Sequence, residues 1–339
     1  MNEKCRQFVL AARPNGKVKE SDLQFREVEI PTAGDSEILV RNQYFSLDPS
    51  MKGHMEDQSD YRAPLQIGDV MAGRTVGEIV ESNNPDYPVG GQVFGMLGMS
   101  DYSVTDGRKI PVHHYKEPVN PEAALGVLGG TGMTAYFGLT EIGQPQAGDV
   151  LVVSGAAGAT GNVAGQIGKI LGCHVIGIAG SEDKCRWLED ELGFDATINY
   201  KQEIIGEALD RCCPDGINIY FDNVGGEILD ACLARIAMSA RIVLCGGISH
   251  YNMESKPPGP SNYFNLVFRR ARMEGFILVD YTSRFDEARL QLRDWYESGL
   301  LKQRSTVVDG FTELPAALVK LFEGYNIGKM MVRNDKFRA

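Results

Sequence analysis

The feature that most constrains this sequence is an apolar stretch that leads straight into a glycine-rich turn and a helix of small residues. The stretch VLVVSGA is followed by Ala156-Ala157-Gly158-Ala159-Thr160-Gly161, a G-x-G-x-x-G pattern in which alanine holds the first place. Small residues let the backbone approach a pyrophosphate, and the start of the helix supplies free N–H groups and positive partial charge. The pattern predicts a dinucleotide-binding turn; the alternative is a tight strand-to-helix turn that holds no ligand.

The turn opens a regular alternation of strands and helices. The next units are HVIGIAG with SEDKCRWLEDELG, ATINY with QEIIGEALDRC, and GINIYFDNV with GEILDACLARI, before a fifth strand, ARIVLCGGI. Strands that alternate with helices in this way form parallel sheets covered by helices. The predicted fold class is therefore α/β, with a doubly wound parallel sheet.

The first third of the chain has a different pattern. Residues 1–120 read as short strands with Pro or Gly near each end, which is typical of an all-β segment. The 339 residues favour two domains. The tail after residue 290 is too short to fold alone. We therefore expect a β-rich domain of residues 1–125 and 290–339, and a dinucleotide-binding domain of residues 126–289.

The tip of the second predicted strand indicates which dinucleotide binds. A site selective for NAD usually has an acidic residue there for the ribose 2′-hydroxyl, but this chain has Gly180-Ser181. Lys184 follows and can attract a 2′-phosphate, and Tyr200 ends the third strand where it can cover the adenosine. These residues favour NADP(H); the alternative is that Lys184 is a solvated helix residue and Tyr200 a packing residue.

Composition excludes several classes of protein. Lys and Arg number 34 against 45 Asp and Glu, a formal net charge of -11 that disfavours nucleic-acid and membrane-surface binding. No run of about 18 apolar residues occurs, and the start lacks the pattern of a secretory leader, so we expect a cytoplasmic protein. The seven cysteines include no C-x-x-C pair, which favours reduced thiols, and we expect no metal site.

Together these motifs resemble the zinc-independent medium-chain dehydrogenase/reductases, in the branch of leukotriene B4 dehydrogenase, prostaglandin reductase and curcumin reductase. The resemblance covers nearly the whole chain. The motifs that carry it are Leu47-Asp48-Pro49, Gly129 to Tyr136, Ser154 to Gly161 with Gly165-Gln166-Ile167, Tyr220 to Gly226, Ile248-Ser249-His250-Tyr251-Asn252, and Asn326-Ile327-Gly328-Lys329.

The resemblance implies a GroES-like domain split across the two chain ends, a Rossmann domain between them, bound NADPH, and a homodimer. It also assigns the cofactor contacts. The residues expected to contact the pyrophosphate are Gly158, Ala159, Thr160 and Gly161, with Lys184 at the 2′-phosphate and Tyr200 and Asn223 on the adenosine side. The residues expected to contact the nicotinamide half are Cys245, Gly246, Gly247, Ile248, Ser249, Tyr251, Phe276, Ile277, Leu278 and Asn326.

The expected reaction is inferred from the absence of the motifs that bind zinc in the zinc-dependent relatives. Gly68-Asp69-Val70 stands where those relatives have Gly-His-Glu, and residues 95–125 contain no cysteine. Without a metal, hydride addition to the β-carbon of an enal or enone is the easier reaction, because the enolate oxygen needs only a hydrogen-bond donor. Tyr251, in the loop after the fifth strand, is the expected donor and the expected catalytic residue.

The sequence defines the residues that contact the substrate less clearly than those that contact the cofactor. Tyr61 stands where curcumin-reductase-like members have a tyrosine facing the substrate, and Ser50 replaces a common tyrosine, which leaves the shape of the substrate pocket open. His250 occupies the variable place of its motif, and we expect no role for it. Two alternatives remain for the function: an NADPH quinone reductase, and a non-catalytic NADPH-binding protein.

Overall fold

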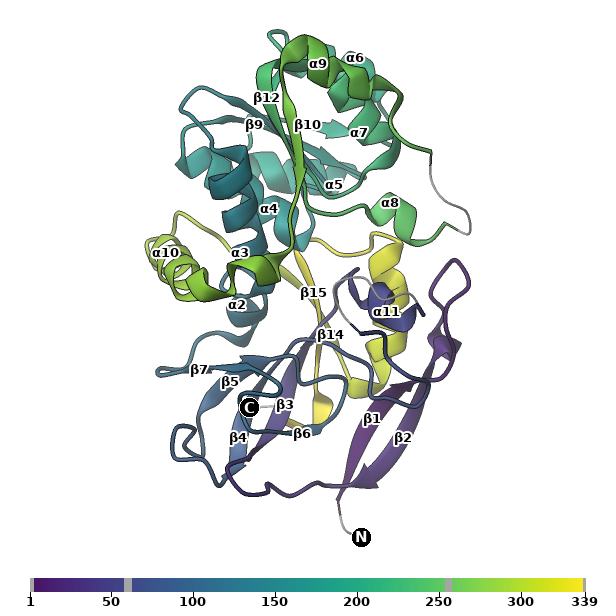
Figure 1. The fold of residues 1–339 in the computed structure, drawn as a ribbon, viewed down its shortest axis with the longest axis vertical. Coiled ribbons are helices and arrows are strands. Elements are labelled where there is room, and N and C mark those ends of the chain that lie inside the picture. The colour runs from purple at the N-terminus through teal and green to yellow at the C-terminus, as the bar shows by residue number, and fades with distance from the viewer. Residues whose placement is uncertain (1–2, 58–62, 254–257, 338–339) are drawn as a thin grey trace. The chain divides into compact units, whose positions relative to one another are not determined.

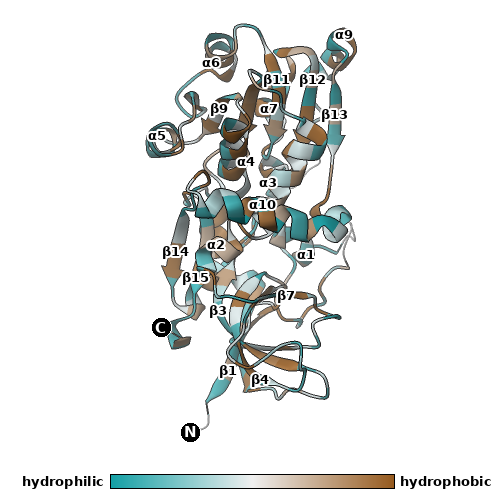
Figure 2. Ribbon diagram, turned by 90° about the vertical axis from the view of Figure 1, so that its left-hand side faces the viewer, coloured by the Kyte–Doolittle hydropathy of each residue, from teal (hydrophilic) through white to brown (hydrophobic). Residues whose placement is uncertain are grey.

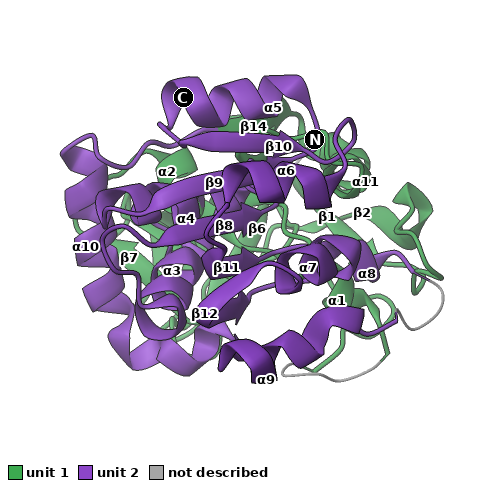
Figure 3. Cartoon of the chain, turned by 90° about the horizontal axis from the view of Figure 1, so that it is seen from above, with its two compact units in different colours: residues 1–125, 305–339 green, residues 126–304 purple. Residues whose placement is uncertain are grey.

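The computed structural model describes residues 3–57, 63–253 and 258–337, and the chain divides into two compact units (Figures 1 and 3). Unit 1 comprises residues 1–125 and 305–339, and unit 2 comprises residues 126–304. The expected boundary at residue 290 is wrong, because helix α10 (Phe285–Glu297) packs on α3 (Gly130–Phe137) within unit 2. There the hydroxyl of Tyr136 donates to Glu287 Oε1 at 3.3 Å.

Unit 2 is built on a six-stranded parallel sheet, which confirms the predicted α/β class. The order is β10-β9-β8-β11-β12-β13, so the chain runs outward from β8 in one direction and then from β11 in the other. The point where the order reverses therefore lies between β8 and β11. The strands are β8 Val150–Ser154, β9 His174–Ala179, β10 Ala196–Asn199, β11 Ile217–Asp222, β12 Ile236–Leu244 and β13 Arg272–Gly275.

Helix α4 (Ala159–Ile170) packs closely on strand β8 and on the segment before β10, because the sequence places glycine at both contacts. A Cβ on Gly165 of α4 would lie 1.9 Å from Phe194 Cζ, and one on Gly168 would lie 2.4 Å from a methyl of Leu151. Figure 2 shows apolar stretches in brown on α4 and on the strands beneath it. The helices of unit 2 are α3, η2 Gly138–Gly143, α4 Ala159–Ile170, α5 Glu182–Arg186, η3 Trp187–Glu191, α6 Ile205–Cys212, α7 Gly226–Leu233, α8 Ile248–Tyr251, η4 Ser261–Phe264, α9 Asn265–Arg269, η5 Leu278–Arg284 and α10.

Unit 1 is rich in strands, with one larger sheet and a two-stranded ribbon. The sheet order is β14-β15-β3-β4-β5-β7, with β6 beside β3, and β1 pairs with β2. Its strands are β1 Lys4–Leu10, β2 Leu23–Glu29, β3 Ile38–Ser46, β4 Thr75–Ser82, β5 Gln92–Gly95, β6 Tyr102–Thr105, β7 Val112–Tyr115, β14 Ser305–Asp309 and β15 Lys329–Arg333. Its helices are η1 Glu20–Asp22, α1 Met51–Met55, α2 Pro121–Leu125, η6 Phe311–Glu313, α11 Leu314–Phe322 and η7 Asp335–Phe337.

The C-terminal tail completes the core of unit 1. Phe311 stacks on Phe8 with ring centroids 5.4 Å apart and meets Phe45 edge-on at the same distance. Arg6 of β1 donates from Nε to Asp101 at 2.9 Å and from Nη2 to Asn334 at 2.8 Å. These contacts join both ends of the chain into one core. Within the described ranges, no helix is long and apolar enough to cross a membrane.

Candidate functional site

The parallel sheet of unit 2 brings most of the predicted cofactor residues to a single edge. Because all six strands are parallel, the residues that follow each strand lie along the carboxyl edge of the sheet, where dinucleotides bind. Gly158 to Gly161 follow β8, Lys184 follows β9, Tyr200 follows β10, Asn223 follows β11, Cys245 to Tyr251 follow β12, and Phe276 to Leu278 follow β13.

The phosphate-binding turn has the geometry that its small residues predict. Gly155 has a φ of 56°, and α4 begins at Ala159 directly after Gly158. A Cβ on Gly161 would lie only 2.3 Å from the carbonyl oxygen of Gly155, and one on Gly158 would lie 3.1 Å from it. The first N–H groups of a helix have no partner within the helix. The turn is therefore a cradle of backbone N–H groups, and it fits a diphosphate.

A buried network holds the ends of β8 and β11 together at the point where the strand order reverses. Asp222 Oδ1 accepts hydrogen bonds from Ser154 Oγ at 2.8 Å, Tyr220 Oη at 2.7 Å and the backbone N–H of Gly225 at 2.9 Å. The amide of Asn223 donates to the carbonyl of Ser154 at 2.7 Å. No pattern in the sequence points to a role for Asp222, although it stands in the Tyr220 to Gly226 motif.

Two lysines and a tyrosine surround the end of β9. A Cβ on Gly180 would lie 2.9 Å from Tyr200 Cε1, so the tyrosine ring lies over this glycine. Desolvation, reinforced by the positive charge of Lys201, lowers the pKa of Lys184. Lys201 Nζ also lies 6.0 Å from the centre of the Tyr200 ring. No motif in the sequence points to Lys201. Two cations that repel one another beside an aromatic ring form a site suited to a phosphate group.

The segment after β12 is anchored to the turn that follows β11. The sequence predicts a loop here, whereas residues Ile248–Tyr251 form the short helix α8. Ser249 Oγ donates to the carbonyl of Val224 at 2.6 Å, and the N–H of Ile248 donates to the carbonyl of Asn223 at 3.2 Å. Tyr251 is half-buried, and its hydroxyl lies 3.8 Å from where a Cβ on Gly246 would stand. The phenol is thus held near the carboxyl edge.

Cys245 begins the same segment as a neutral thiol. Burial, with a smaller contribution from the charge of Asp222, raises its pKa to about 12. A thiol that does not ionise is a poor nucleophile. We therefore expect any contact from Cys245 to a cofactor to be one of packing or of its backbone groups.

Other predicted residues are held by local contacts or belong to unit 1. The ring of Phe276 packs on Gly138, where an added Cβ would lie 2.8 Å from it, so packing occupies this side chain. In unit 1, Asn326 is buried and donates to the carbonyl of Gly328 at 2.7 Å, and Ser50 is exposed just before α1. Tyr61 lies outside the described residues.

Two of the sequence motifs meet in unit 1 through a buried ion pair. Lys329 Nζ lies 2.9 Å from Asp48 Oδ1 and donates to the carbonyl of Leu47 at 2.6 Å. Burial alone would raise the pKa of Asp48, but the charges of Lys329 and Arg74 and the hydroxyl of Ser46 outweigh it and lower the pKa to about 2. Burial lowers the pKa of Lys329, and Asp48 opposes that shift. This pair joins strand β15 to the segment after β3.

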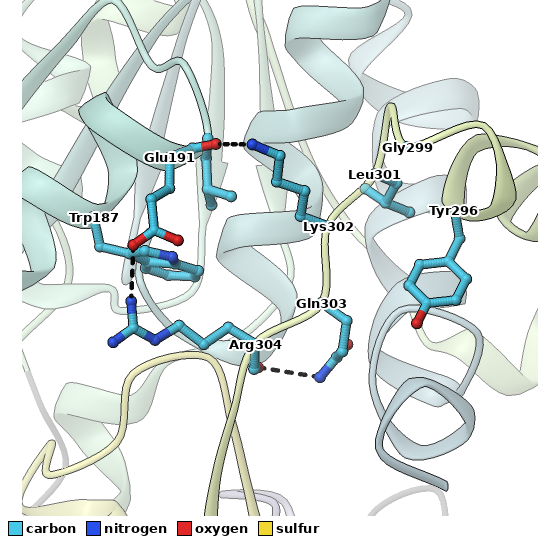
Figure 4. A pocket seen from close by; sticks show the side chains of 9 residues that line it. Trp187, Glu191, Tyr296, Gly299, Leu301, Lys302, Gln303 and Arg304 are labelled. Atoms are coloured by element: carbon cyan, nitrogen blue, oxygen red, sulfur yellow. Dashed lines mark hydrogen bonds and ion pairs between the residues drawn. The ribbon is translucent and has the colours of Figure 1, made fainter. Parts of the chain in front are cut away.

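A cavity of about 770 Å³ in unit 2 is lined by none of the predicted site residues that the structure describes (Figure 4). Several of its polar lining groups pair with one another: Lys302 Nζ donates to the carbonyl of Glu191 at 2.6 Å, and Arg304 lies 3.5 Å from the Glu191 carboxylate. The Arg304 guanidinium also lies over the Trp187 ring, 5.2 Å from its centre. These contacts hold in place the segment that leaves unit 2.

Among the residues that the structure describes, no group of three or more His, Cys, Asp or Glu is placed to hold a metal ion.

Two family models and several relatives match this chain. The model for the N-terminal domain of oxidoreductase matches residues 6–112, and the model for zinc-binding dehydrogenase matches residues 159–293. The chain is 40% identical to NADPH-dependent curcumin reductase of Escherichia coli over 98% of this chain and 97% of that protein. It is 38% identical to the NADP(+)-dependent 2-alkenal reductase of Nicotiana tabacum over 96% of each. These matches define an oxidoreductase.

A solved structure agrees with the sequence matches. CurA from Vibrio vulnificus, 43% identical, superposes with a TM-score of 0.92 over 98% of this chain and all of that chain. A structure of CurA in complex with NADPH has the same identity and TM-score. The chain belongs to the zinc-independent medium-chain dehydrogenase/reductases, in the branch that includes curcumin, alkenal and prostaglandin reductases. The predicted resemblance is confirmed.

Proposed function

We propose that this protein reduces the carbon–carbon double bond of α,β-unsaturated aldehydes and ketones with NADPH. The observation that carries the proposal is that the Tyr251 phenol stands at the same carboxyl edge as a cradle for a diphosphate and a pair of lysines. NADPH supplies a hydride when it is bound. The substrate's β-carbon accepts the hydride, and negative charge develops on the carbonyl oxygen, where Tyr251 donates a hydrogen bond; a proton from water then adds to the α-carbon.

The cofactor-binding roles follow the order of the strands. The backbone N–H groups of Ala159, Thr160 and Gly161 hold the diphosphate, with Gly158 leaving room for it. Lys184 and Lys201 bind the 2′-phosphate, which selects NADPH over NADH. These residues fit the group, because free backbone N–H groups suit its diphosphate and two positive charges suit its 2′-phosphate.

The remaining contacts are proposed from the family pattern and the strand ends. Tyr200 covers the adenine, and Asn223 lies on the adenosine side. The nicotinamide half is held by residues 245–249, Tyr251, residues 276–278 and Asn326. On the family pattern alone, Ser50 and Tyr61 are the proposed substrate contacts.

The proposal is tested by measuring NADPH consumption with a panel of 2-alkenals, enones and quinones, repeated with NADH. We expect turnover of the alkenals and enones with NADPH and much slower turnover with NADH. Faster NADPH consumption with quinones than with alkenals and enones would instead identify the protein as a quinone reductase. Tight NADPH binding without turnover of any compound would indicate a non-catalytic NADPH-binding protein.

We further propose that the protein is a cytoplasmic homodimer that joins through the β13 edge of unit 2. Strand β13 ends the sheet order, and an edge strand can pair with the same strand of a second copy around a two-fold axis. Large apolar side chains are exposed beside it, on Tyr263, Phe264, Val267 and Phe268. All seven cysteines are free thiols, which suits a reducing compartment.

The dimer is tested by light scattering after size-exclusion chromatography. Phe268→Lys should shift the mass of the particle towards the monomer. Leu290→Lys is the matched control, since Leu290 is a similarly exposed apolar residue on α10. Equal masses for both variants and the parent would argue against this interface.

A further inference from the structure

Two buried polar atoms flank Tyr251, one on each side. His250 Nε2 and Asn252 Oδ1 are buried and have no hydrogen-bond partner among the described residues. A buried donor or acceptor without a partner is unfavourable, and each such group in a native structure calls for an explanation. Two such atoms lie next to the proposed catalytic tyrosine. Their position indicates that a ligand bound at this segment supplies the missing hydrogen bonds.

The His250 ring lies along the turn that follows β11. A Cβ on Gly225 would lie 3.0 Å from His250 Cε1 and 3.3 Å from Nε2, and one on Gly226 would lie 3.8 Å from Nε2. Both glycines have positive φ, 73° and 59°. The ring therefore occupies space that a side chain on this turn would fill. This turn borders the point where the strand order reverses, the place where dinucleotides bind in such sheets.

Backbone contacts fix where the imidazole stands. The N–H of Ser249 donates to the carbonyl of Val224 at 3.2 Å, and the N–H of His250 donates to the carbonyl of Gly247 at 2.8 Å. The segment is thus anchored to the turn after β11 through its neighbours, while the imidazole's own Nε2 has no partner within the part of the chain that the structure describes. A group that is held in place and lacks a partner is preorganised for a ligand.

We propose that His250 is a cofactor-binding residue whose Nε2 hydrogen-bonds an oxygen of the nicotinamide half of NADPH. The proposal rests on the proposed use of NADPH and assigns a role that the sequence did not indicate. Because His250 and Tyr251 are neighbours in α8, this bond also fixes the short helix that carries the phenol.

The test compares two ligands and two variants by fluorescence or calorimetric titration. The ligands are NADPH and adenosine 2′,5′-bisphosphate, which has the adenosine and 2′-phosphate but lacks the nicotinamide half. His250→Leu keeps the bulk of the side chain and removes its hydrogen bond, and His250→Gln places an amide nitrogen near the position of Nε2. Met253→Leu is the control, an exposed apolar change in the same segment. Thermal unfolding of each variant verifies its fold.

We expect His250→Leu to weaken NADPH binding about three- to tenfold, the effect of one hydrogen bond, with the affinity for the bisphosphate unchanged. His250→Gln should stay within about twofold of the parent. Unchanged NADPH affinity in His250→Leu, equal losses for both ligands, or a Gln variant as weak as the Leu variant would each overturn the assignment. If the proposed reaction is wrong, enone turnover will be absent. The binding measurements do not depend on turnover, so the two failures can be distinguished.

Discussion

Removing Lys184 or Lys201 should weaken the binding of NADPH and leave NADH nearly unaffected. The side chain of Lys184 is half-buried, and its lowered pKa reflects desolvation and the nearby charge of Lys201. A hydrogen bond from a partly desolvated ammonium to a phosphate contributes about 1.5 to 3 kcal/mol, so Lys184→Ala should cost about ten- to 150-fold in NADPH affinity.

The effect of Lys201 should be smaller, because its side chain is exposed. Exposed charge pairs contribute about 0.2 to 1 kcal/mol, which corresponds to a loss of at most about fivefold for Lys201→Ala. Salt screens exposed charges more than buried ones. The loss in Lys201→Ala should therefore nearly vanish at high ionic strength, while much of the loss in Lys184→Ala should persist.

The assay is fluorescence titration of each variant with NADPH and with NADH, at low and high salt. Lys169→Ala serves as the control, since Lys169 lies near the end of α4 away from the phosphate cradle and pairs with Asp195 at 2.7 Å. Equal losses for NADPH and NADH in Lys184→Ala would show that Lys184 supports the fold and does not bind the 2′-phosphate. A larger loss in Lys201→Ala than in Lys184→Ala would refute the argument from burial.

Three further predictions concern the reaction and the fold. Tyr251→Phe should lower kcat for an alkenal about ten- to a hundredfold with NADPH affinity unchanged, as stopped-flow and titration measurements would show, because the lost bond forms only in the transition state. Lys329→Met should lower the free energy of unfolding by about 3 to 5 kcal/mol in urea denaturation, and adding Asp48→Asn should restore part of it. Because the folded-state pKa of Asp48, about 2, is below its ordinary value, this pair's stabilisation is complete at neutral pH and is lost as the pH falls from about 4 to 2. Gly161→Ala should lower both thermal stability and dinucleotide affinity, since the added methyl would meet the carbonyl of Gly155.

The sequence by itself determined the fold class and the likeness to the medium-chain reductases. Both depend on local patterns: a strand that enters a turn of small residues, and strands that alternate with helices. The carboxyl edge follows from the same patterns, because parallel strands must end on the same side of their sheet. Lys184, Tyr200 and Tyr251 were therefore predicted at this edge from sequence order alone, and their roles remain predictions.

Only the tertiary structure decided the contacts between residues far apart in the chain. The Asp48–Lys329 pair joins two motifs whose meeting no local pattern indicates, and the end of unit 2 at residue 304 depends on α10 packing against α3. The place of His250 against Gly225 is also decided by packing, because the position in its motif indicated no role. Local propensity fixes which element forms, whereas the partner of a buried side chain depends on which distant elements fold against it.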